Sequence, residues 1–188
     1  MPEITKDQQR AAAKAARQAI PDDQREASDR AICRRVADHP ALREARMVLS
    51  YMAFAGEVDL AGLHDTLRDQ GKGLCFPVCR DEGVIQALSP RDEDCWEEGR
   101  YGIWAPDAGR SELVAPEEID VVLVPCVAFD ASRLRLGWGG GYYDRFLPRC
   151  LEAFSIGAAY EVQRVERVVS DHPYDAVLDA VATELRWY

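Results

Sequence analysis

A continuous apolar run, IDVVLVPCVAF at residues 119–129, limits the fold more than any other stretch of the 188-residue chain. A strand with one covered face alternates apolar and polar residues, whereas an unbroken apolar strand needs cover on both faces. We therefore expect residues 119–129 to form a central strand between two layers. Helical and strand patterns alternate along the rest of the chain, which predicts an α/β fold.

The other expected elements follow from periodicity and from helix-start and helix-stop residues. Thr5 and Gln8 form a capping-box pattern before an Ala-rich run that Pro21 closes, which predicts a first helix at 5–20. Pro148 interrupts the last helical pattern, so a kink or two short pieces are expected there. Further helices are expected at 23–38, 59–70 and 142–154, strands at 47–54, 73–79, 84–88, 155–160 and 180–183, and an acidic loop with a short helical turn at 91–100. No repeat or low-complexity segment divides the chain, so residues 1–188 are expected to form one domain.

Charge and composition exclude some classes of function. The formal net charge is −10, and the field of such a chain repels nucleic acids and anionic membranes. No apolar run approaches the ~20 residues of a membrane span, and the polar N-terminus lacks the apolar centre of a signal peptide. We therefore expect a cytoplasmic protein, monomeric by default, that binds neither nucleic acid nor membrane. The six cysteines are expected to be buried, reduced thiols, since nothing completes a zinc site around Cys75 and Cys79.

A glycine-rich stretch follows the central apolar run. RLRLGWGGGYYDRFL at residues 133–147 places three consecutive glycines between the predicted strand and a predicted helix. Glycine lets a backbone approach a ligand closely, and a helix N-terminus offers free N–H groups, so this layout is suited to a phosphate group. The spacing matches neither a P-loop nor a dinucleotide fingerprint, and a flexible turn is the plain alternative.

Asp144 adds a second signal to the glycine loop. It follows Gly141 by three residues, in the first turn of the predicted helix. A carboxylate next to a phosphate is repelled unless a divalent cation lies between them, and nucleotide-bound Mg²⁺ typically takes one or two protein carboxylates. The loop and Asp144 together predict a magnesium-nucleotide site. The alternative is an aspartate that only favours the helix dipole.

The residues around this loop resemble the signature of the 5-formyltetrahydrofolate cyclo-ligase family, also called 5,10-methenyltetrahydrofolate synthetase. That pattern is close to V-P-G-x-A-F-D followed by R-L-G-[YFR]-G-[GK]-G-Y-Y-D-R. This chain matches it at Val124, Pro125, Ala128, Phe129, Asp130, Arg135, Leu136, Gly137, Gly139, Gly141, Tyr142, Tyr143, Asp144 and Arg145. Other similar segments are Lys6-x3-Arg10, YMAFAGEVDL at 51–60, YGIWAP at 101–106 and YDAVLDAVATE at 174–184. Two positions depart from the pattern, since Ala105 stands where Glu is usual and Tyr174 where His is usual.

The resemblance implies a fold and a reaction. The fold is a single-domain α/β/α sandwich with a central mixed, mainly parallel sheet of the NagB/RpiA/CoA-transferase-like type. The reaction uses ATP and Mg²⁺ to close 5-formyltetrahydrofolate, with or without a polyglutamate tail, to 5,10-methenyltetrahydrofolate with release of ADP and phosphate. The formyl oxygen attacks the γ-phosphate, and N10 then displaces phosphate from the activated carbon. Such chemistry asks the protein mainly for positioning and charge neutralisation.

The resemblance also implies roles for single residues. Arg135, Tyr142 and Asp144 are expected to be catalytic, and Asp144 and Asp175 to ligate magnesium. Residues expected to bind ATP are Lys6, Arg10, Arg135, Leu136, Gly137, Trp138, Gly139, Gly140, Gly141, Tyr142 and Tyr143. Residues expected to bind the folate are Met52, Glu57, Tyr101, Trp138 and Tyr142, and the Glu57 carboxylate is expected to accept two adjacent pterin donors.

Plainer alternatives stay open for several of these residues. Lys6 and Arg10, at i and i+4, are compatible with a solvated basic helix face. Glu57 is compatible with a loop residue before a helix, Asp175 with a turn residue, and Trp138 with a structural aromatic. Two other functions also stay open: a related enzyme with a changed substrate, and a nucleotide- or folate-binding module without turnover.

Overall fold

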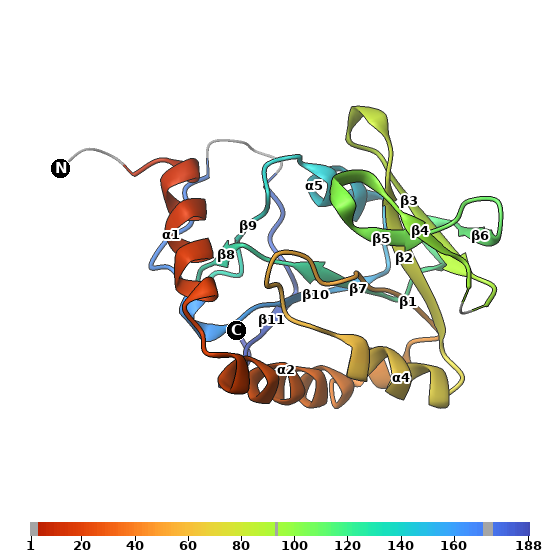
Figure 1. Cartoon of the computed structure of the whole chain (residues 1–188), viewed down its shortest axis with the longest axis horizontal. Helices are drawn as coiled ribbons and strands as arrows, with labels where there is room; N and C mark the ends of the chain where they lie inside the picture. Colours follow the sequence, from red (N-terminus) through yellow and green to blue (C-terminus); the bar gives the residue numbers. More distant parts are fainter. Residues whose placement is uncertain (1–3, 93, 171–174) are drawn as a thin grey trace.

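The computed structural model describes residues 4–92, 94–170 and 175–188, and its centre is a seven-stranded mixed sheet. The strands are β1 (Met47–Leu49), β2 (Gly73–Cys79), β3 (Ile85–Pro90), β6 (Ser111–Val114), β7 (Val121–Pro125), β10 (Phe154–Ala158) and β11 (Ala180–Ala182). Their order is β11-β10-β7-β1-β2-β3-β6; the pairs from β11 to β2 are parallel, and those from β2 to β6 are antiparallel. The expected mixed, mainly parallel sheet in a single α/β domain is confirmed (Figure 1).

Strand β7 is the central strand that the apolar run predicted. Its residues from Val121 to Val124 have no exposed surface. Val121 and Leu123 pack into one core cluster, and Val122 and Val124 pack into another. The unbroken run is therefore explained by two cores, one on each face of the sheet. The strand is shorter than the predicted 119–129, because the chain leaves the sheet after Pro125 and pairs again in a small separate ladder.

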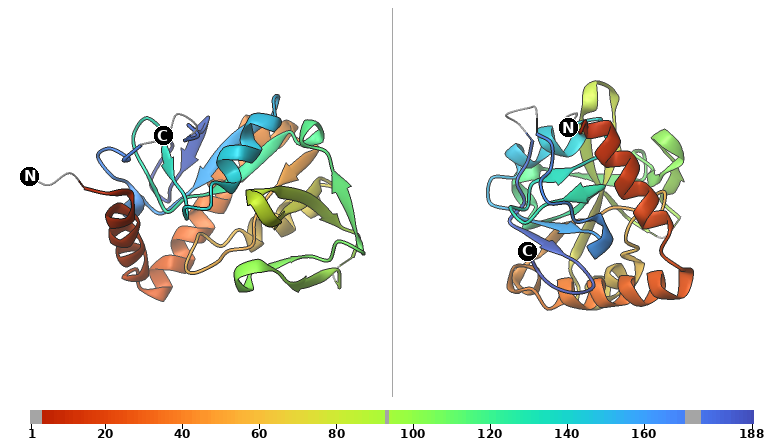
Figure 2. Two further views of the ribbon diagram at one scale, coloured as in Figure 1. Left: turned by 90° about the horizontal axis from the view of Figure 1, so that it is seen from above. Right: turned by 90° about the vertical axis from the view of Figure 1, so that its left-hand side faces the viewer.

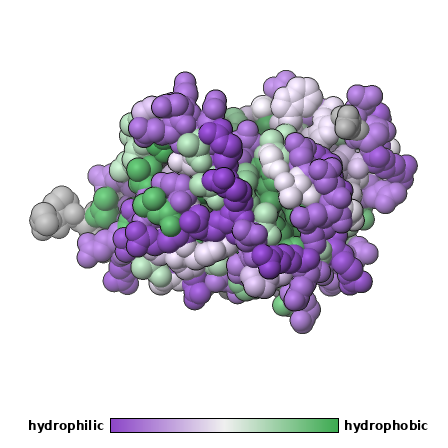
Figure 3. Space-filling model, turned by 90° about the horizontal axis from the view of Figure 1, so that it is seen from below, coloured by the Kyte–Doolittle hydropathy of each residue, from purple (hydrophilic) through white to green (hydrophobic). Residues whose placement is uncertain are grey.

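Helices cover both faces of the sheet. The helices α2 (Asp22–Ala37) and α4 (Ala61–Asp69) lie against one face, and α5 (Tyr142–Phe146) lies on the other (Figure 1). Ile32 and Val36 of α2 and Leu63 and Leu67 of α4 fill the first core, while Phe146 of α5 belongs to the second. Seen from the side of α2 and α4, the surface is mostly hydrophilic with smaller apolar areas between (Figure 3). No helix in the described ranges has the length and apolar character needed to cross a membrane.

Helix α1 (Lys6–Gln18) stands apart from these layers, at one end of the molecule and steeply inclined to α2 (Figures 1 and 2). The predicted capping box is present, because Thr5 Oγ1 accepts from the Gln8 N–H and the Gln8 side chain accepts from the Thr5 N–H. The helix is fastened by Gln9, whose side chain donates to the Arg167 carbonyl and accepts from the Val169 N–H. These bonds tie the N-terminal helix to a segment near the end of the chain.

Several elements differ from the sequence prediction. Pro40 begins helix α3 (Pro40–Glu44) instead of only ending the helix before it, since proline is suited to a first helical position. The predicted strand 47–54 stops at Leu49, where the chain leaves the sheet. The predicted helix 142–154 ends early, but the two short pieces expected around Pro148 are confirmed as α5 and one 3-10 turn at Leu147–Arg149. Strand β6 was not expected at all.

The acidic segment 91–100 is the clearest error. It contains β4 (Trp96–Glu98), which pairs antiparallel with β5 (Trp104–Pro106), instead of a loop with a helical turn. Cys95 is buried beside it, and the Trp96 ring lies 4.9 Å from that of Phe76 at a steep angle. This packing against β2 decides the local structure, and the acidic side chains alone gave no sign of it. The predicted departure at Tyr174 lies outside the described residues.

Candidate functional site

A cavity of about 1140 Å³ opens where the chain leaves the carboxyl ends of β1, β2 and β7. Tyr51, Cys79 and Pro125 mark these three strand ends in its wall. Ligand sites in sheets with parallel strands form at this edge, because the following loops converge there. All of the residues to which the sequence assigns a site role line this one cavity, from Lys6 and Arg10 through Met52, Glu57, Tyr101 and residues 135–144 to Asp175.

The glycine loop forms one wall of the cavity. It follows a two-stranded ladder of β8 (Ala128–Phe129) and β9 (Arg135–Leu136), and it ends where α5 begins at Tyr142. Gly139 and Gly141 have φ angles of 103° and 65°, which side chains rarely adopt. A Cβ on Gly137 would lie 2.7 Å from an Arg135 nitrogen, and one on Gly140 would lie 2.8 Å from the Tyr142 ring. The loop therefore requires glycine at these positions, whereas a flexible turn would not.

The helix behind the loop is shorter than expected. Helix α5 has five residues, so its N-terminus offers a weaker dipole than the predicted helix of 142–154 would. Cationic side chains supply the positive charge instead, and those in the wall are Lys6, Arg10, Arg100, Arg135 and Arg145. The acidic residues in the described wall are Glu57, Asp144 and Asp175. A positive local surface thus lies within a chain of net charge −10.

Arg135 is held firmly beside the loop. Its side chain is 3% exposed, and Nη2 lies 2.8 Å from Asp144 Oδ1. Its Nε is buried, and no hydrogen-bond partner for it exists in the described ranges 4–92, 94–170 and 175–188. A buried N–H of this kind is costly unless something accepts from it, so Arg135 is suited to an anionic ligand.

The two basic residues predicted on one face of the first helix both point to this site. Arg10 Nε donates to the Gly137 carbonyl at 2.9 Å, and Lys6 Nζ lies 2.8 Å from Asp175 Oδ2. Because of these contacts, α1 borders the glycine loop and the cavity instead of presenting a merely solvated basic face. The second bond also places Asp175 in the wall, more than 160 positions along the chain from Lys6.

The two predicted metal ligands lie in the same region of the cavity. The Asp144 carboxylate accepts from Arg135, and its Oδ1 lies 3.4 Å from the Ala176 N–H, next to Asp175. The described residues contain no group of three or more His, Cys, Asp or Glu side chains that could hold a metal ion. A nucleotide-bound Mg²⁺ needs fewer protein ligands, because phosphate and water oxygens complete its shell. Two carboxylates beside a phosphate-sized cradle fit that requirement.

Glu57 lies at the other side of the cavity, and the turn before it orients its side chain. Ala55 and Gly56 have φ angles of 48° and 80°, and the Glu57 side chain is folded back so that Oε2 accepts from the Phe54 N–H at 3.0 Å. Its Oε1 accepts from the Trp138 Nε1–H at 2.7 Å. Burial raises the pKa of this carboxyl above its ordinary value of 4.5, while the two hydrogen bonds and the Arg17 charge act against the increase.

Trp138 connects the two halves of the site. Its indole donates to Glu57, its ring centroid lies 5.6 Å from that of Phe54, and Lys14 Nζ lies 4.0 Å above its ring. The glycine loop is therefore in contact with the predicted folate carboxylate. This arrangement places any phosphate held by the loop next to any ring system held by Glu57.

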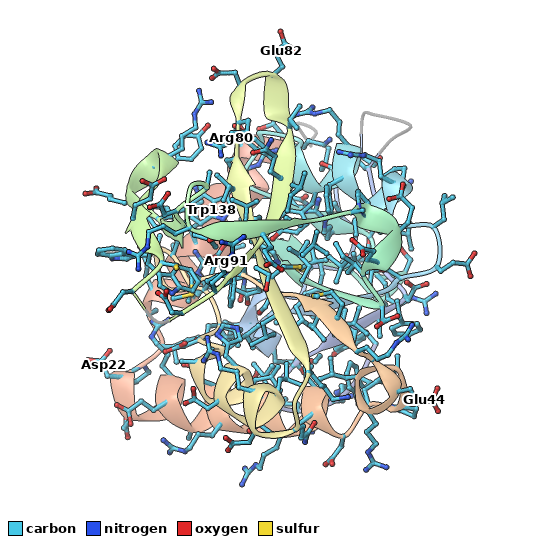
Figure 4. All side chains as sticks on the ribbon, turned by 90° about the vertical axis from the view of Figure 1, so that its right-hand side faces the viewer. Asp22, Glu44, Arg80, Glu82, Arg91 and Trp138 are labelled. Carbon is cyan, nitrogen blue, oxygen red and sulfur yellow. The ribbon has the colours of Figure 1, made fainter. Side chains whose placement is uncertain are left out.

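Three tyrosines complete the wall. The Tyr142 hydroxyl donates to the Arg80 carbonyl at 3.2 Å, and Arg145 Nε donates to the Gly83 carbonyl, so α5 leans on the turn between β2 and β3. Figure 4 shows Arg80 below the tip of this turn and Glu82 pointing away from it. The Tyr143 hydroxyl is buried and has no hydrogen-bond partner among the described residues. Tyr101 is at the mouth and is 60% exposed.

Sequence reasoning assigned no role to several wall residues, among them Arg100, Trp104, Arg145 and Cys79. Arg145 is the last position of the matched signature, and Trp104 and the buried Ala105 belong to the YGIWAP segment, so their neighbours in sequence gave a usable signal. Arg100 is in the segment wrongly predicted as a loop. The six cysteines are free as expected, and Cys33 and Cys79 are only half-buried.

Comparisons with known proteins agree with this arrangement. The sequence model of the 5-formyltetrahydrofolate cyclo-ligase family matches residues 3–184. The 5-formyltetrahydrofolate cyclo-ligase of Haemophilus influenzae is 31% identical over 134 residues, covering 69% of this chain and 72% of the relative. The 5-formyltetrahydrofolate cyclo-ligase of Escherichia coli is 29% identical over 171 residues, covering 89% of this chain and 93% of the relative.

Solved structures with the same fold also belong to this group. The NMR structure of Aquifex aeolicus 5,10-methenyltetrahydrofolate synthetase has a TM-score of 0.85 at 30% identity, with 98% of this chain and 92% of that chain covered. The structure of a Mycoplasma pneumoniae 5,10-methenyltetrahydrofolate synthetase has a TM-score of 0.79 at 21% identity, with 96% of this chain and 99% of that chain covered. At this identity, the match supports the fold alone. The matched range, the sequence identity and the shared fold lead to one conclusion: the chain belongs to the 5-formyltetrahydrofolate cyclo-ligase family of enzymes.

Proposed function

We propose that this protein catalyses the ATP-dependent cyclisation of 5-formyltetrahydrofolate to 5,10-methenyltetrahydrofolate, with release of ADP and phosphate. The observation that carries the proposal is the hydrogen bond between Trp138 of the glycine loop and Glu57, 2.7 Å long. It brings a cationic, bare-backbone cradle and a buried carboxylate into one cavity. A reaction between a phosphate and a reduced pterin needs these two environments in contact.

The cationic half would bind the triphosphate. Residues 136–141 offer backbone groups, Arg135 offers a buried Nε, and Lys6 and Arg10 approach from α1. Asp144 and Asp175 would hold Mg²⁺, which when bound would offset the charge that develops on the phosphate groups. Arg135 already holds Asp144 in place through their 2.8 Å ion pair, so the carboxylate and the guanidinium would face the same ligand as one unit.

The other half would bind the folate. The 2-amino group and the adjacent ring N–H of a reduced pterin are neighbouring donors, and one carboxylate accepts both. Glu57 would supply this carboxylate, since it is 8% exposed and its Oε1 accepts an N–H from the Trp138 indole. Met52 and Tyr101 also line the cavity, and both would contact the folate.

The chemistry would proceed in two steps. The formyl oxygen on N5 attacks the γ-phosphorus and ADP leaves, which converts a poorly electrophilic amide carbon into an imidate phosphate. N10 then attacks that carbon, loses its proton, and phosphate departs to leave the methenyl bridge. Arg135, Lys6 and Arg10 would stabilise the phosphate charge, and Tyr142 and Trp138 would limit the access of water to the reacting carbon.

A related enzyme with a changed substrate is the second candidate, and one observation favours it. Ala105, which stands where the family usually has glutamate, is buried in the cavity wall at the folate side. A missing carboxylate there removes one acceptor for the substrate. Monomeric state, cytoplasmic location and acceptance of polyglutamylated folate stay predictions from the sequence.

One assay separates the candidates. Purified protein is mixed with 5-formyltetrahydrofolate, Mg²⁺ and ATP, and methenyl absorbance in the near ultraviolet is followed together with phosphate release. Equal amounts of both products are expected. Phosphate without methenyl product would point to a changed substrate, and binding of both ligands without either product would point to a binding module. Glu57→Gln serves as the control that the activity belongs to this site.

A further inference from the structure

Arg17 is a buried cation to which neither the sequence nor the proposed chemistry gives a role. It is in the last turn of α1, and the residue is 1% exposed. Its Nη2 donates to the Ala55 carbonyl at 2.7 Å, while Nε and Nη1 are buried with no hydrogen-bond partner in the described part of the chain. It does not line the cavity, so it cannot touch a ligand there. A guanidinium buried in this way is costly unless a nearby negative charge compensates it.

The backbone that Arg17 holds is the turn that presents Glu57. Ala55 and Gly56 both have positive φ angles, and the Glu57 N–H donates to the Phe54 carbonyl at 3.1 Å. Arg25 of α2 supports the same turn from outside, since Nη1 donates to the Gly56 carbonyl at 3.2 Å and Nη2 donates to the Arg17 carbonyl at 2.9 Å. Two arginines from two helices therefore fix a strained turn whose next residue carries the carboxylate.

Besides its hydrogen bonds from Trp138 and Phe54, the Glu57 carboxylate has the positive charge of Arg17 nearby. Three titratable groups interact with Glu57: Tyr51 just after β1, Cys126 just after β7, and Tyr143 of α5. Burial raises the pKa of each, to about 12 for the Cys126 thiol, so all three are neutral near pH 7. From α1, the Arg17 charge lowers the pKa of the Glu57 carboxyl. The Arg17 guanidinium carbon also lies 5.5 Å from the centroid of the Trp138 ring, whose N–H donates to Glu57.

We propose that Arg17 is a positioning residue for the folate: it fixes the Ala55–Gly56 turn and supplies the buried positive charge that keeps the Glu57 carboxylate ionised. The proposal rests on the proposed function in which Glu57 accepts two donors from the pterin. A protonated Glu57 would present a hydroxyl donor in place of one acceptor, and the pterin donors would lose a partner. Without Arg17, only the hydrogen bonds from Trp138 and Phe54 would oppose the effect of burial on Glu57, and protonation would begin at a higher pH.

The direct test titrates Glu57 in the free protein. Glutamate labelled with ¹³C at the carboxyl carbon is incorporated, and the Glu57 signal is identified by its loss in Glu57→Gln. Arg17→Gln keeps a donor for the Ala55 carbonyl but removes the charge, and it is expected to raise the titration midpoint of Glu57 by about one pH unit or more. Arg17→Lys keeps the charge and is expected to stay within a few tenths of a unit of the wild-type midpoint.

Arg25 offers a matched control, because it holds the same turn without supporting the carboxylate. Arg25→Gln is expected to leave the Glu57 midpoint near that of the wild type. If Arg17→Gln does not fold, Arg17→Met takes its place, since it keeps the apolar stem and removes the unpaired N–H groups. An unchanged midpoint in the neutral variant, or an equal shift in Arg25→Gln, would overturn the proposal.

A second measurement separates this proposal from the proposed function. The dissociation constant of 5-formyltetrahydrofolate is measured by calorimetry at pH 6 and pH 8. Arg17→Gln is expected to lose more affinity at pH 6 than at pH 8, by up to about tenfold for a one-unit shift of the midpoint, while its affinity for ATP stays unchanged. A shifted midpoint with wild-type folate affinity in both Arg17→Gln and Glu57→Gln would refute the pterin-binding role of Glu57 and leave the effect of Arg17 on it intact.

Discussion

Charged side chains in this cavity form ion pairs that orient them, as Asp144 shows. Asp144 is within 2.8 Å of Arg135, so its carboxylate is already oriented before any metal arrives. Asp144→Asn keeps the size and a hydrogen-bond acceptor but removes the negative charge that a divalent cation requires. We expect turnover to methenyl product to fall about 100-fold or more while the melting temperature changes little. Asp65→Asn, on the exposed face of α4, is the matched control. Wild-type turnover in Asp144→Asn would refute the magnesium assignment.

The glycines of the loop also differ residue by residue. Gly139 has a φ of 103°, and a Cβ there would lie 3.4 Å from the Arg10 guanidinium. Gly139→Ala is therefore expected to cost about 1–3 kcal/mol in free energy of unfolding and to raise the KM for ATP. Gly62→Ala in α4 meets no atom within 4 Å and is expected to stabilise the protein slightly. Urea unfolding and ATP kinetics check both changes, and equal behaviour of the two variants would contradict the account of the loop.

Elements in this fold depend on a few buried polar contacts, of which His64 gives the clearest case. His64 joins α4 to the end of β1 through the 2.7 Å contact between its Nε2 and Ser50 Oγ. Burial lowers the pKa of His64 from its ordinary 6.5 to about 4. The unfolded chain therefore binds a proton between these two values while the folded chain does not. The stability from neutral His64 is complete above pH 6.5 and is lost as the pH falls towards 4.

This shift predicts a measurable pH dependence. The wild type is expected to lose up to about 3 kcal/mol of unfolding free energy between pH 6.5 and pH 4 on account of His64. His64→Gln is expected to be less stable at pH 7 but to show a smaller decrease over that range. Urea unfolding at several pH values provides the measurement, with the half-buried His39→Gln as control. The same decrease in His64→Gln and in the wild type would show that other groups cause it.

The elements that sequence predicted best are those whose pattern is local. The apolar run of β7 and the capping box of α1 determine their own structure, and the structure agrees with both. Strand β4 was missed because its pairing partner and its contact with Phe76 lie elsewhere in the chain. Most residues predicted for the site come from one contiguous signature and line one cavity, whereas the burial of Arg17 was hidden in a helix whose basic residues otherwise suggested a solvated face.

At the scale of the whole molecule, the cavity is assembled from parts far apart in the sequence. Helix α1 is fastened to the glycine loop by Arg10, to Asp175 by Lys6, and to residues 167 and 169 by Gln9. The triphosphate and the folate would share Trp138 and Tyr142. Ligands that share ordered residues bind with a mutual coupling free energy.

We therefore expect each ligand to strengthen the binding of the other. A non-hydrolysable ATP analogue with Mg²⁺ is expected to lower the dissociation constant of 5-formyltetrahydrofolate by about fivefold or more. The reciprocal titration must give the same factor, which provides an internal control. Calorimetry of the four binding steps measures both factors. Independent affinities would contradict a shared loop and favour two separate subsites.

In the free protein the Trp138 indole donates a hydrogen bond to Glu57, so it would compete with a folate for that carboxylate in the proposed site. An indole tethered a few ångströms from the carboxylate acts at the effective concentration of an intramolecular partner, in the millimolar range or above. A pterin would have to displace the indole from Glu57. A ligand with one N–H donor would compete poorly for the carboxylate, whereas a ligand with two adjacent N–H donors would succeed. The same displacement would break the contact between Glu57 and Trp138, which belongs to the loop proposed to bind the nucleotide. Binding of a folate at Glu57 would thus change the contacts of the glycine loop. The fluorescence emission of Trp138 would report this change.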